Sequence, residues 1–103
     1  MDTHQGSCHC GNISFEMTTD LAYTLVCNCS FCVRRNAVLH GVSAENFRVL
    51  KGDAGEPKGA RTYGSGIFLH HFCPQCGIQC FTRVDSNRGP RVNVNMGCFD
   101  PAQ

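Results

Sequence analysis

The chain has 103 residues, of which 42% are hydrophobic and nine are cysteine, and its formal net charge is +1. This length favours one domain, residues 1–103. So small a net charge gives no electrostatic case for binding nucleic acid or an anionic membrane surface. No apolar run approaches the roughly 20 residues that cross a bilayer, so we expect no membrane partner.

The first seven residues are polar and lack the apolar core of a signal peptide. We therefore expect a reducing, cytoplasmic compartment. In such a compartment, closely spaced cysteines bind metal more often than they form disulfides.

Cys8 and Cys10 form the first cysteine pair, and Gly11 follows them directly. A glycine after a metal-binding cysteine suits a tight turn with positive φ. His9 lies between the two cysteines, and alternation directs its side chain away from their thiolates. We therefore do not expect His9 to be a ligand.

A strand is predicted next, because Ile13, Phe15 and Met17 alternate with polar residues over 12–17. Residues 22–26 resemble a second short β segment that leads into the next cysteines.

The densest cysteine cluster is Cys27, Cys29 and Cys32, three thiols within six residues. Cysteines this close bridge one another only with strain. Thiolates at positions i and i+2 of an extended segment point to the same face, and three soft sulfur ligands select zinc or a similarly thiophilic ion. A catalytic zinc keeps three protein ligands and leaves the fourth position for water or substrate.

Arg34 and Arg35 follow this cluster directly, where residues 33–36 are expected to form a helical turn or a loop. The two arginines are either a solvated surface pair or an anchor for a substrate carboxylate beside the metal. The second reading has a physical basis, because a guanidinium binds a carboxylate through two hydrogen bonds.

The middle of the chain predicts further short strands. Residues 37–42 are β-like, 43–46 form a turn or one helical turn that Ser43 can cap, and 47–50 form a strand. Residues 52–66 hold five of the eleven glycines and predict loops, interrupted by a short strand near 62–63. Residues 67–72 are again β-like, and one of their two histidines, His70 or His71, is expected to pack inside.

Cys73 and Cys76 are separated by two residues and followed by Gly77. This spacing is the common half-site of a structural zinc centre. Residues 80–84 and 92–96 then predict a strand pair joined by a turn-rich loop.

No segment predicts a helix of ten residues, so we expect a mainly β domain of short, curved strands held together by metal. Two clusters of two cysteines sum to the four thiolates of a closed tetrahedral site. The count therefore predicts a structural zinc on Cys8, Cys10, Cys73 and Cys76, and an open site on Cys27, Cys29 and Cys32. Cys80 and Cys98 remain, and either can complete the second site and close it.

The three cysteine clusters resemble those of the glutathione-dependent formaldehyde-activating enzyme family, including its short branch related to centromere protein V. The resemblance is carried by residues 6–11, 27–32 and 71–77, with weaker support from 86–87, 92–94 and 98–100. It implies several coiled antiparallel β-sheets organised around two zinc ions, one structural and one catalytic. The ligands implied are those that the count predicts.

The resemblance also implies a carbon–sulfur lyase that joins formaldehyde to glutathione as S-hydroxymethylglutathione, or reverses that step. The partners would be a small-molecule thiol, glutathione or a relative, and an aldehyde. A non-catalytic, zinc-stabilised binding module is the alternative.

Overall fold

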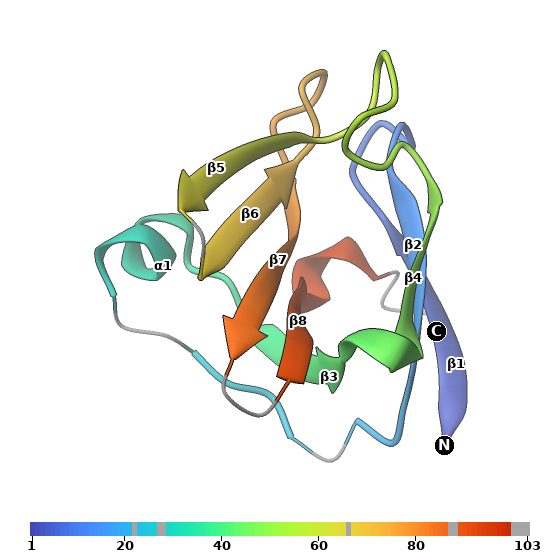
Figure 1. The fold of residues 1–103 in the computed structure, drawn as a ribbon, viewed down its shortest axis with the longest axis vertical. Coiled ribbons are helices and arrows are strands. Elements are labelled where there is room, and N and C mark those ends of the chain that lie inside the picture. Colours follow the sequence, from blue (N-terminus) through green and yellow to red (C-terminus); the bar gives the residue numbers. More distant parts are fainter. Residues whose placement is uncertain (22, 27–28, 66, 87–88, 100–103) are drawn as a thin grey trace.

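Two antiparallel sheets and one short helix make up the computed structural model, which describes residues 1–21, 23–26, 29–65, 67–86 and 89–99 (Figure 1). Its strands are β1 (Asp2–Ser7), β2 (Ser14–Thr19), β3 (Leu39–Ser43), β4 (Phe47–Lys51), β5 (Arg61–Ser65), β6 (Phe68–Phe72), β7 (Gln79–Ser86) and β8 (Gly89–Asn95). Helix α1 spans Ser30–Arg35, and single turns of 3-10 helix, η1 and η2, span Ala44–Asn46 and Met96–Cys98. The mainly β prediction is confirmed.

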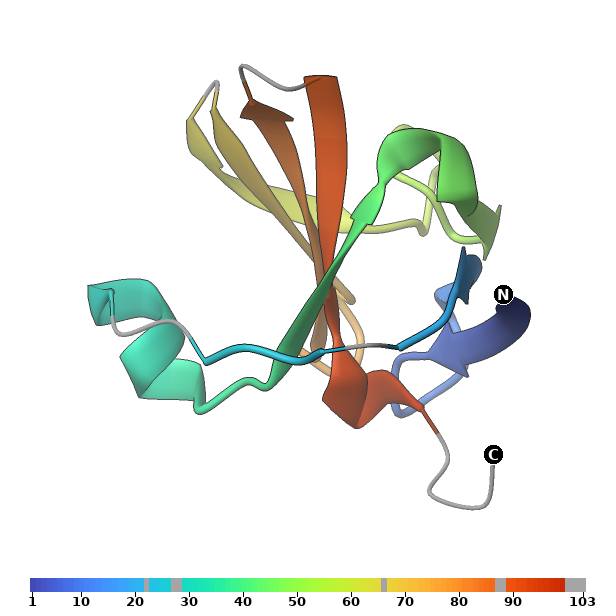
Figure 2. The same cartoon turned by 90° about the horizontal axis from the view of Figure 1, so that it is seen from below.

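The smaller sheet has the strand order β1-β2-β4, and the larger one has the order β3-β8-β7-β6-β5. All strand pairs within the two sheets are antiparallel. Helix α1 lies beside the larger sheet, on the side away from the smaller one (Figures 1 and 2). This arrangement leaves one face of the larger sheet for the core and the other for contacts with α1.

The core lies between the two sheets, and β2, which begins two residues later than the predicted strand over 12–17, supplies its centre together with Ile13 just before it. Ile13, Phe15 and Met17 are fully buried, as their alternation predicts. Phe15 packs against Phe47, Phe81 and Phe99, with ring centroids 5.5 to 5.8 Å apart. Burying aromatic side chains of this size contributes much of the hydrophobic stabilisation of a small domain.

One strand was not predicted, and two local predictions need correction. The polar N-terminus forms strand β1, whose backbone pairs with β2 while most of its side chains stay exposed. In the described part of residues 22–26 only Leu25 makes a bridge, to Leu39, so the β segment predicted there is not a strand. Ser43 precedes η1, but its side chain makes no capping hydrogen bond.

Within the described residues, no helix is long and apolar enough to cross a membrane.

Candidate metal centres

Two similar turns bring four cysteines together. Cys8 and Cys10 lie in the turn between β1 and β2, and Cys73 and Cys76 lie in the turn between β6 and β7. Each turn is closed by a backbone hydrogen bond from its first cysteine, Cys8 to Ile13 at 3.0 Å and Cys73 to Ile78 at 2.9 Å. Each also contains a glycine with positive φ, Gly11 at 81° and Gly77 at 79°, a conformation that glycine adopts without steric cost.

The sulfur atoms of these four residues all lie within 4.8 Å of one another. The Sγ atoms of Cys8 and Cys10 are 3.7 Å apart, and those of Cys10 and Cys73 are 3.6 Å apart. A tetrahedral zinc with Zn–S bonds of about 2.3 Å separates its sulfurs by roughly 3.8 Å. Four thiolates at this spacing match the donor set and size of a closed zinc site, so the cluster can hold a metal ion.

Backbone amides surround the same sulfurs and stabilise negative charge on them. The N–H of Ile13 donates to Sγ of Cys8, and the N–H of Gln75 donates to Sγ of Cys73, both at 3.3 Å. At Cys76 burial opposes ionisation, but the N–H groups of Ile78 and Cys10 outweigh it and lower the pKa of the thiol to about 6. The thiols of Cys73 and Cys76, whose pKa values are both lowered, are therefore prepared to carry negative charge, which a bound cation would balance. At Cys10 the N–H of Asn12 is outweighed by burial and by hydrogen bonds with the neighbouring thiols, which raise the pKa of its thiol to about 11.

Cys80 and Cys98 lie in the main core. Cys80 is fully buried, and a hydrogen bond with Cys98, followed by burial, strongly raises the pKa of its thiol. Both belong to the same buried cluster as Cys8 and Cys73. Cys32 lies in a separate small cluster with Ala37 and Leu39. Among the described residues, then, Cys80 and Cys98 are grouped with the four-cysteine cluster and not with Cys32.

The second cysteine group lies at the start of α1, and its member Cys27 lies outside the described residues. Cys29 is the N-cap of the helix, where its Sγ accepts a hydrogen bond of 3.4 Å from the N–H of Cys32. Cys29 is exposed and Cys32 is buried. Two of the three predicted ligands therefore lie one helical turn apart, one facing solvent and one facing the sheet.

The guanidinium of Arg35 lies against Cys32. Its Nη2 donates to Sγ of Cys32 at 3.2 Å, and its Nη1 donates to Oε1 of Gln79 on β7. Its Cζ lies 4.7 Å from the ring centroid of Phe31. Its Nε is buried and has no hydrogen-bond partner among the described residues. A guanidinium so placed puts a fixed positive charge beside a candidate metal ligand.

Arg34, the other arginine of the predicted pair, is in a different environment. Its side chain is exposed, and its Nη1 donates to the carbonyl of Ser30 at 2.8 Å. The two arginines are thus not an equivalent pair, because one contacts Cys32 and the other borders solvent.

Aromatic rings attach α1 to the larger sheet. Phe31 stacks on His70 with 4.0 Å between the ring centroids, and Tyr63 lies 5.8 Å from Phe31. Nδ1 of His70 lies 2.7 Å from Oγ1 of Thr82. Burial first, and then the positive charge of Arg35, lowers the pKa of His70. His70 is therefore neutral at pH 7 and forms part of the surface beside the helix.

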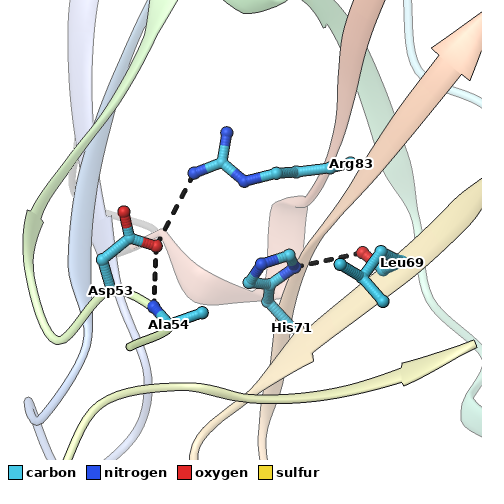
Figure 3. Close-up of polar contacts among 5 residues, drawn as sticks. All are labelled: Asp53, Ala54, Leu69, His71 and Arg83. Atoms are coloured by element: carbon cyan, nitrogen blue, oxygen red, sulfur yellow. Dashed lines mark hydrogen bonds and ion pairs between the residues drawn. The ribbon is translucent and has the colours of Figure 1, made fainter. Parts of the chain in front are cut away.

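His71 follows His70 on β6, so alternation along the strand places it on the opposite face; Figure 3 shows it beside Leu69, Arg83 and Asp53. Its ring is buried and stacks on Phe81 at 4.6 Å, and its Nδ1 lies 3.0 Å from the carbonyl oxygen of Leu69. Nearby, Arg83 of β7 reaches Asp53 at 3.7 Å. His71 is thus the inward-packing histidine of the pair, and it lies in the core.

Gln79, Thr82 and Tyr63 surround the candidate site but were not singled out from the sequence. Gln79 and Thr82 lie on β7 and Tyr63 lies on β5, and the pairing of these strands with β6 brings all three residues beside α1. Only the register of the paired strands shows that these residues lie near α1, and no sequence motif encodes that register.

The family model of the glutathione-dependent formaldehyde-activating enzyme matches residues 3–103. A crystal structure of a Rhodobacter sphaeroides protein is similar to this chain, with a TM-score of 0.76 and 27% sequence identity. That alignment covers 96% of this chain and 90% of the other. Both comparisons extend over nearly the whole chain.

Proposed function

Since the chain belongs to the glutathione-dependent formaldehyde-activating enzyme family, we propose that it is a carbon–sulfur lyase acting on S-hydroxymethylglutathione or a related thiol–aldehyde adduct. Cys27, Cys29 and Cys32 would hold a catalytic zinc that can accept a substrate thiol, and the four-cysteine cluster would hold a structural zinc. The observation that carries the proposal is the separation of the two groups. The turns gather four of the seven motif cysteines into one closed set, and Cys29 and Cys32 lie apart on α1.

The bound zinc supplies a positive charge that keeps a neighbouring thiol deprotonated. In the synthetic direction, the glutathione sulfur attacks the carbonyl carbon of formaldehyde and a carbon–sulfur bond forms. The carbonyl oxygen receives the π electron pair and takes up the proton that the thiol has lost. The lyase direction reverses these steps.

Arg35 balances charge in this reaction. Three thiolates and one divalent cation sum to a charge of −1, and a substrate thiolate adds another negative charge. The guanidinium 3.2 Å from Sγ of Cys32 offsets part of this excess, and charge-assisted contacts of this kind are stronger than neutral hydrogen bonds. Arg34, exposed on the same helix, is our candidate for contact with a substrate carboxylate at the rim. We assign the activity to the cytoplasm, because thiolates bind metal only while they are reduced.

Exchange spectroscopy by NMR tests this function, since it measures the rate at which 13C-formaldehyde and S-hydroxymethylglutathione interconvert. We expect the zinc-loaded protein to raise this rate above that of the spontaneous reaction. Cys29→Ser should abolish the increase while its circular dichroism spectrum stays that of the wild type. If the zinc-loaded wild type does not raise the rate, the lyase function is wrong, and the alternative, a non-catalytic zinc-stabilised binding module, takes its place.

A further inference from the structure

The connector, residues 20–26, leads from the end of β2 toward the second cysteine group and runs past β3 (Figure 2). Its described residues belong to no strand or helix, and among them Leu25 alone forms a β bridge, to Leu39. Two backbone hydrogen bonds of 2.8 Å make this bridge. The path of the chain into the cysteine group therefore depends on side chains that hold the connector from outside.

His40 of β3 supplies such a side chain. It is 2% exposed, and both of its ring nitrogens have a partner. Nδ1 lies 2.7 Å from the carbonyl oxygen of Tyr23 in the connector, and Nε2 lies 2.7 Å from Oγ1 of Thr19, the last residue of β2. Because a carbonyl oxygen only accepts, Nδ1 carries the proton and donates to Tyr23, and Nε2 of this tautomer accepts from the hydroxyl of Thr19.

The turn into the connector has an unusual backbone conformation. Leu21 has a φ of 52°, in the left-handed region that leucine rarely adopts. Its N–H donates to Oγ1 of Thr19 at 3.2 Å, so the hydroxyl that contacts His40 also holds this turn. A residue in such a conformation persists where its surroundings fix it. The contacts from Leu21 through Thr19 and His40 to Tyr23 therefore close the turn.

Leu39, the neighbour of His40 on β3, links the connector to the helix. It bridges Leu25, and it lies in one buried cluster with Cys32 and Ala37. Two adjacent residues of β3 thus hold the chain before and after the second cysteine group. The polar bonds of His40 run to β2 and to the connector, outside its own sheet. Losing these bonds loosens the connector and leaves the pairing of β3 with β8 in place.

We propose that His40 is a positioning residue for the second metal group. By holding the carbonyl of Tyr23, it sets the path by which the chain enters the group of Cys27, Cys29 and Cys32. The role of these cysteines as metal ligands rests on the proposed function.

Two substitutions separate the two bonds of His40. Nδ1 of histidine and the amide nitrogen of asparagine are both attached to Cγ, so His40→Asn retains a donor for Tyr23. Nε2 of histidine and the amide nitrogen of glutamine both lie two bonds beyond Cγ, so His40→Gln reaches Thr19 and leaves the carbonyl of Tyr23 without its donor. The glutamine variant should therefore be the damaging one.

Zinc itself is the probe, and its affinity is measured by chelator competition on the 15N-labelled protein. The amide NMR signal of Cys32 reports the second group, and that of Gly77 reports the four-cysteine cluster. His40→Gln should raise the zinc dissociation constant read at Cys32 at least about tenfold, the lower end of the effect of residues that support metal ligands. The constant read at Gly77, and both constants in His40→Asn, should stay within about threefold of the wild type.

His71→Gln is the matched control. His71 is also 2% exposed, and its Nδ1 donates to a carbonyl oxygen, that of Leu69 in its own strand. The substitution removes the same kind of bond from the core without touching the connector, so the zinc dissociation constant read at Cys32 should stay within about twofold. Equal effects of His40→Gln and His71→Gln at Cys32 would indicate a general loss of stability and overturn the positioning role.

Three other outcomes also overturn it: wild-type zinc affinity at Cys32 in His40→Gln, equal losses in His40→Asn and His40→Gln, or a wild-type Cys32 signal that zinc does not move. If the His40 variants do not fold, Thr19→Val removes the hydroxyl that holds both Nε2 and the turn at Leu21. It should weaken zinc binding at Cys32 and not at Gly77, and unchanged binding at Cys32 counts against the role equally.

This role and the proposed function can fail separately. If the wild type accelerates carbon–sulfur exchange while His40→Gln keeps wild-type zinc affinity at Cys32, the function stands and the positioning role is wrong. If His40→Gln loses zinc at Cys32 while the zinc-loaded wild type does not accelerate exchange, the positioning role stands and the proposed reaction is wrong.

Discussion

Replacing one cysteine in each candidate metal centre separates a metal that maintains the fold from one that serves chemistry. Cys76→Ser removes a candidate ligand from the four-cysteine cluster. Cys76 is only half-buried and serine is similar in shape, so little packing is lost with the sulfur. Cys29→Ser removes the exposed proposed ligand Cys29 and leaves a residue that caps helices well. The matched substitutions therefore report on the metal at each site.

The four-cysteine cluster joins segments far apart in the sequence, which sets the scale of its effect. Cys10 and Cys73 are 63 positions apart, and a cross-link that closes a loop of this length stabilises the folded state by about 4 kcal/mol through chain entropy. For a domain of this size, 1 kcal/mol moves the melting temperature by about 4–8 °C. We therefore expect Cys76→Ser to melt at least about 15 °C below the wild type, or not to fold.

Thermal unfolding followed by circular dichroism, with zinc measured on the same samples, gives the comparison. Cys29→Ser should melt within a few degrees of the wild type and hold one zinc fewer. The reasoning is refuted if Cys76→Ser melts within about 5 °C of the wild type. It is equally refuted if Cys29→Ser loses as much stability as Cys76→Ser.

Three further outcomes are expected. Elemental analysis of the purified protein should find close to two zinc ions per chain, and a metal-free, fully folded preparation would contradict this. Arg35→Met should lower the carbon–sulfur exchange rate at least about tenfold, whereas Arg34→Met should mainly raise the Michaelis constant. Equal effects of the two substitutions on the rate would show that the contact of Arg35 with Cys32 does not contribute to catalysis. Phe15→Ala, which empties the centre of the core, should lower the free energy of unfolding in urea by about 3–5 kcal/mol, and a loss below 1 kcal/mol would mean that the core is arranged differently.

The sequence predicted those features that depend on local pattern. Alternation at Ile13, Phe15 and Met17 identified a buried strand, because a period of two places all three on one face. Counting the cysteine clusters identified Cys8, Cys10, Cys73 and Cys76 as a set, and the structure brings their sulfurs within 4.8 Å. Spacing is informative here because each pair lies in a tight turn of its own.

Features that depend on strand pairing were not predicted. Strand β1 is a polar edge strand that bonds through its backbone to β2, so its side chains carry no hydrophobic signal. The approach of Asn93 to Gly41 depends on the register of β8 against β3, and a shift of one residue would place both on the other face. The two arginines after Cys32 look alike in the sequence, and only the helix geometry distinguishes them.

The two cysteine groups also differ in what holds them in place, and this difference bears on substrate exchange. Cys8 and Cys73 are embedded in the main core between the sheets. Helix α1 has only a small buried cluster of its own, and it is attached to the larger sheet by the stacking of Phe31 on His70 and by the contact of Arg35 with Gln79. Segments with few buried apolar contacts open locally with a low free-energy cost. Under the proposed function, a metal that accepts and releases substrate is therefore better placed beside α1 than in the core.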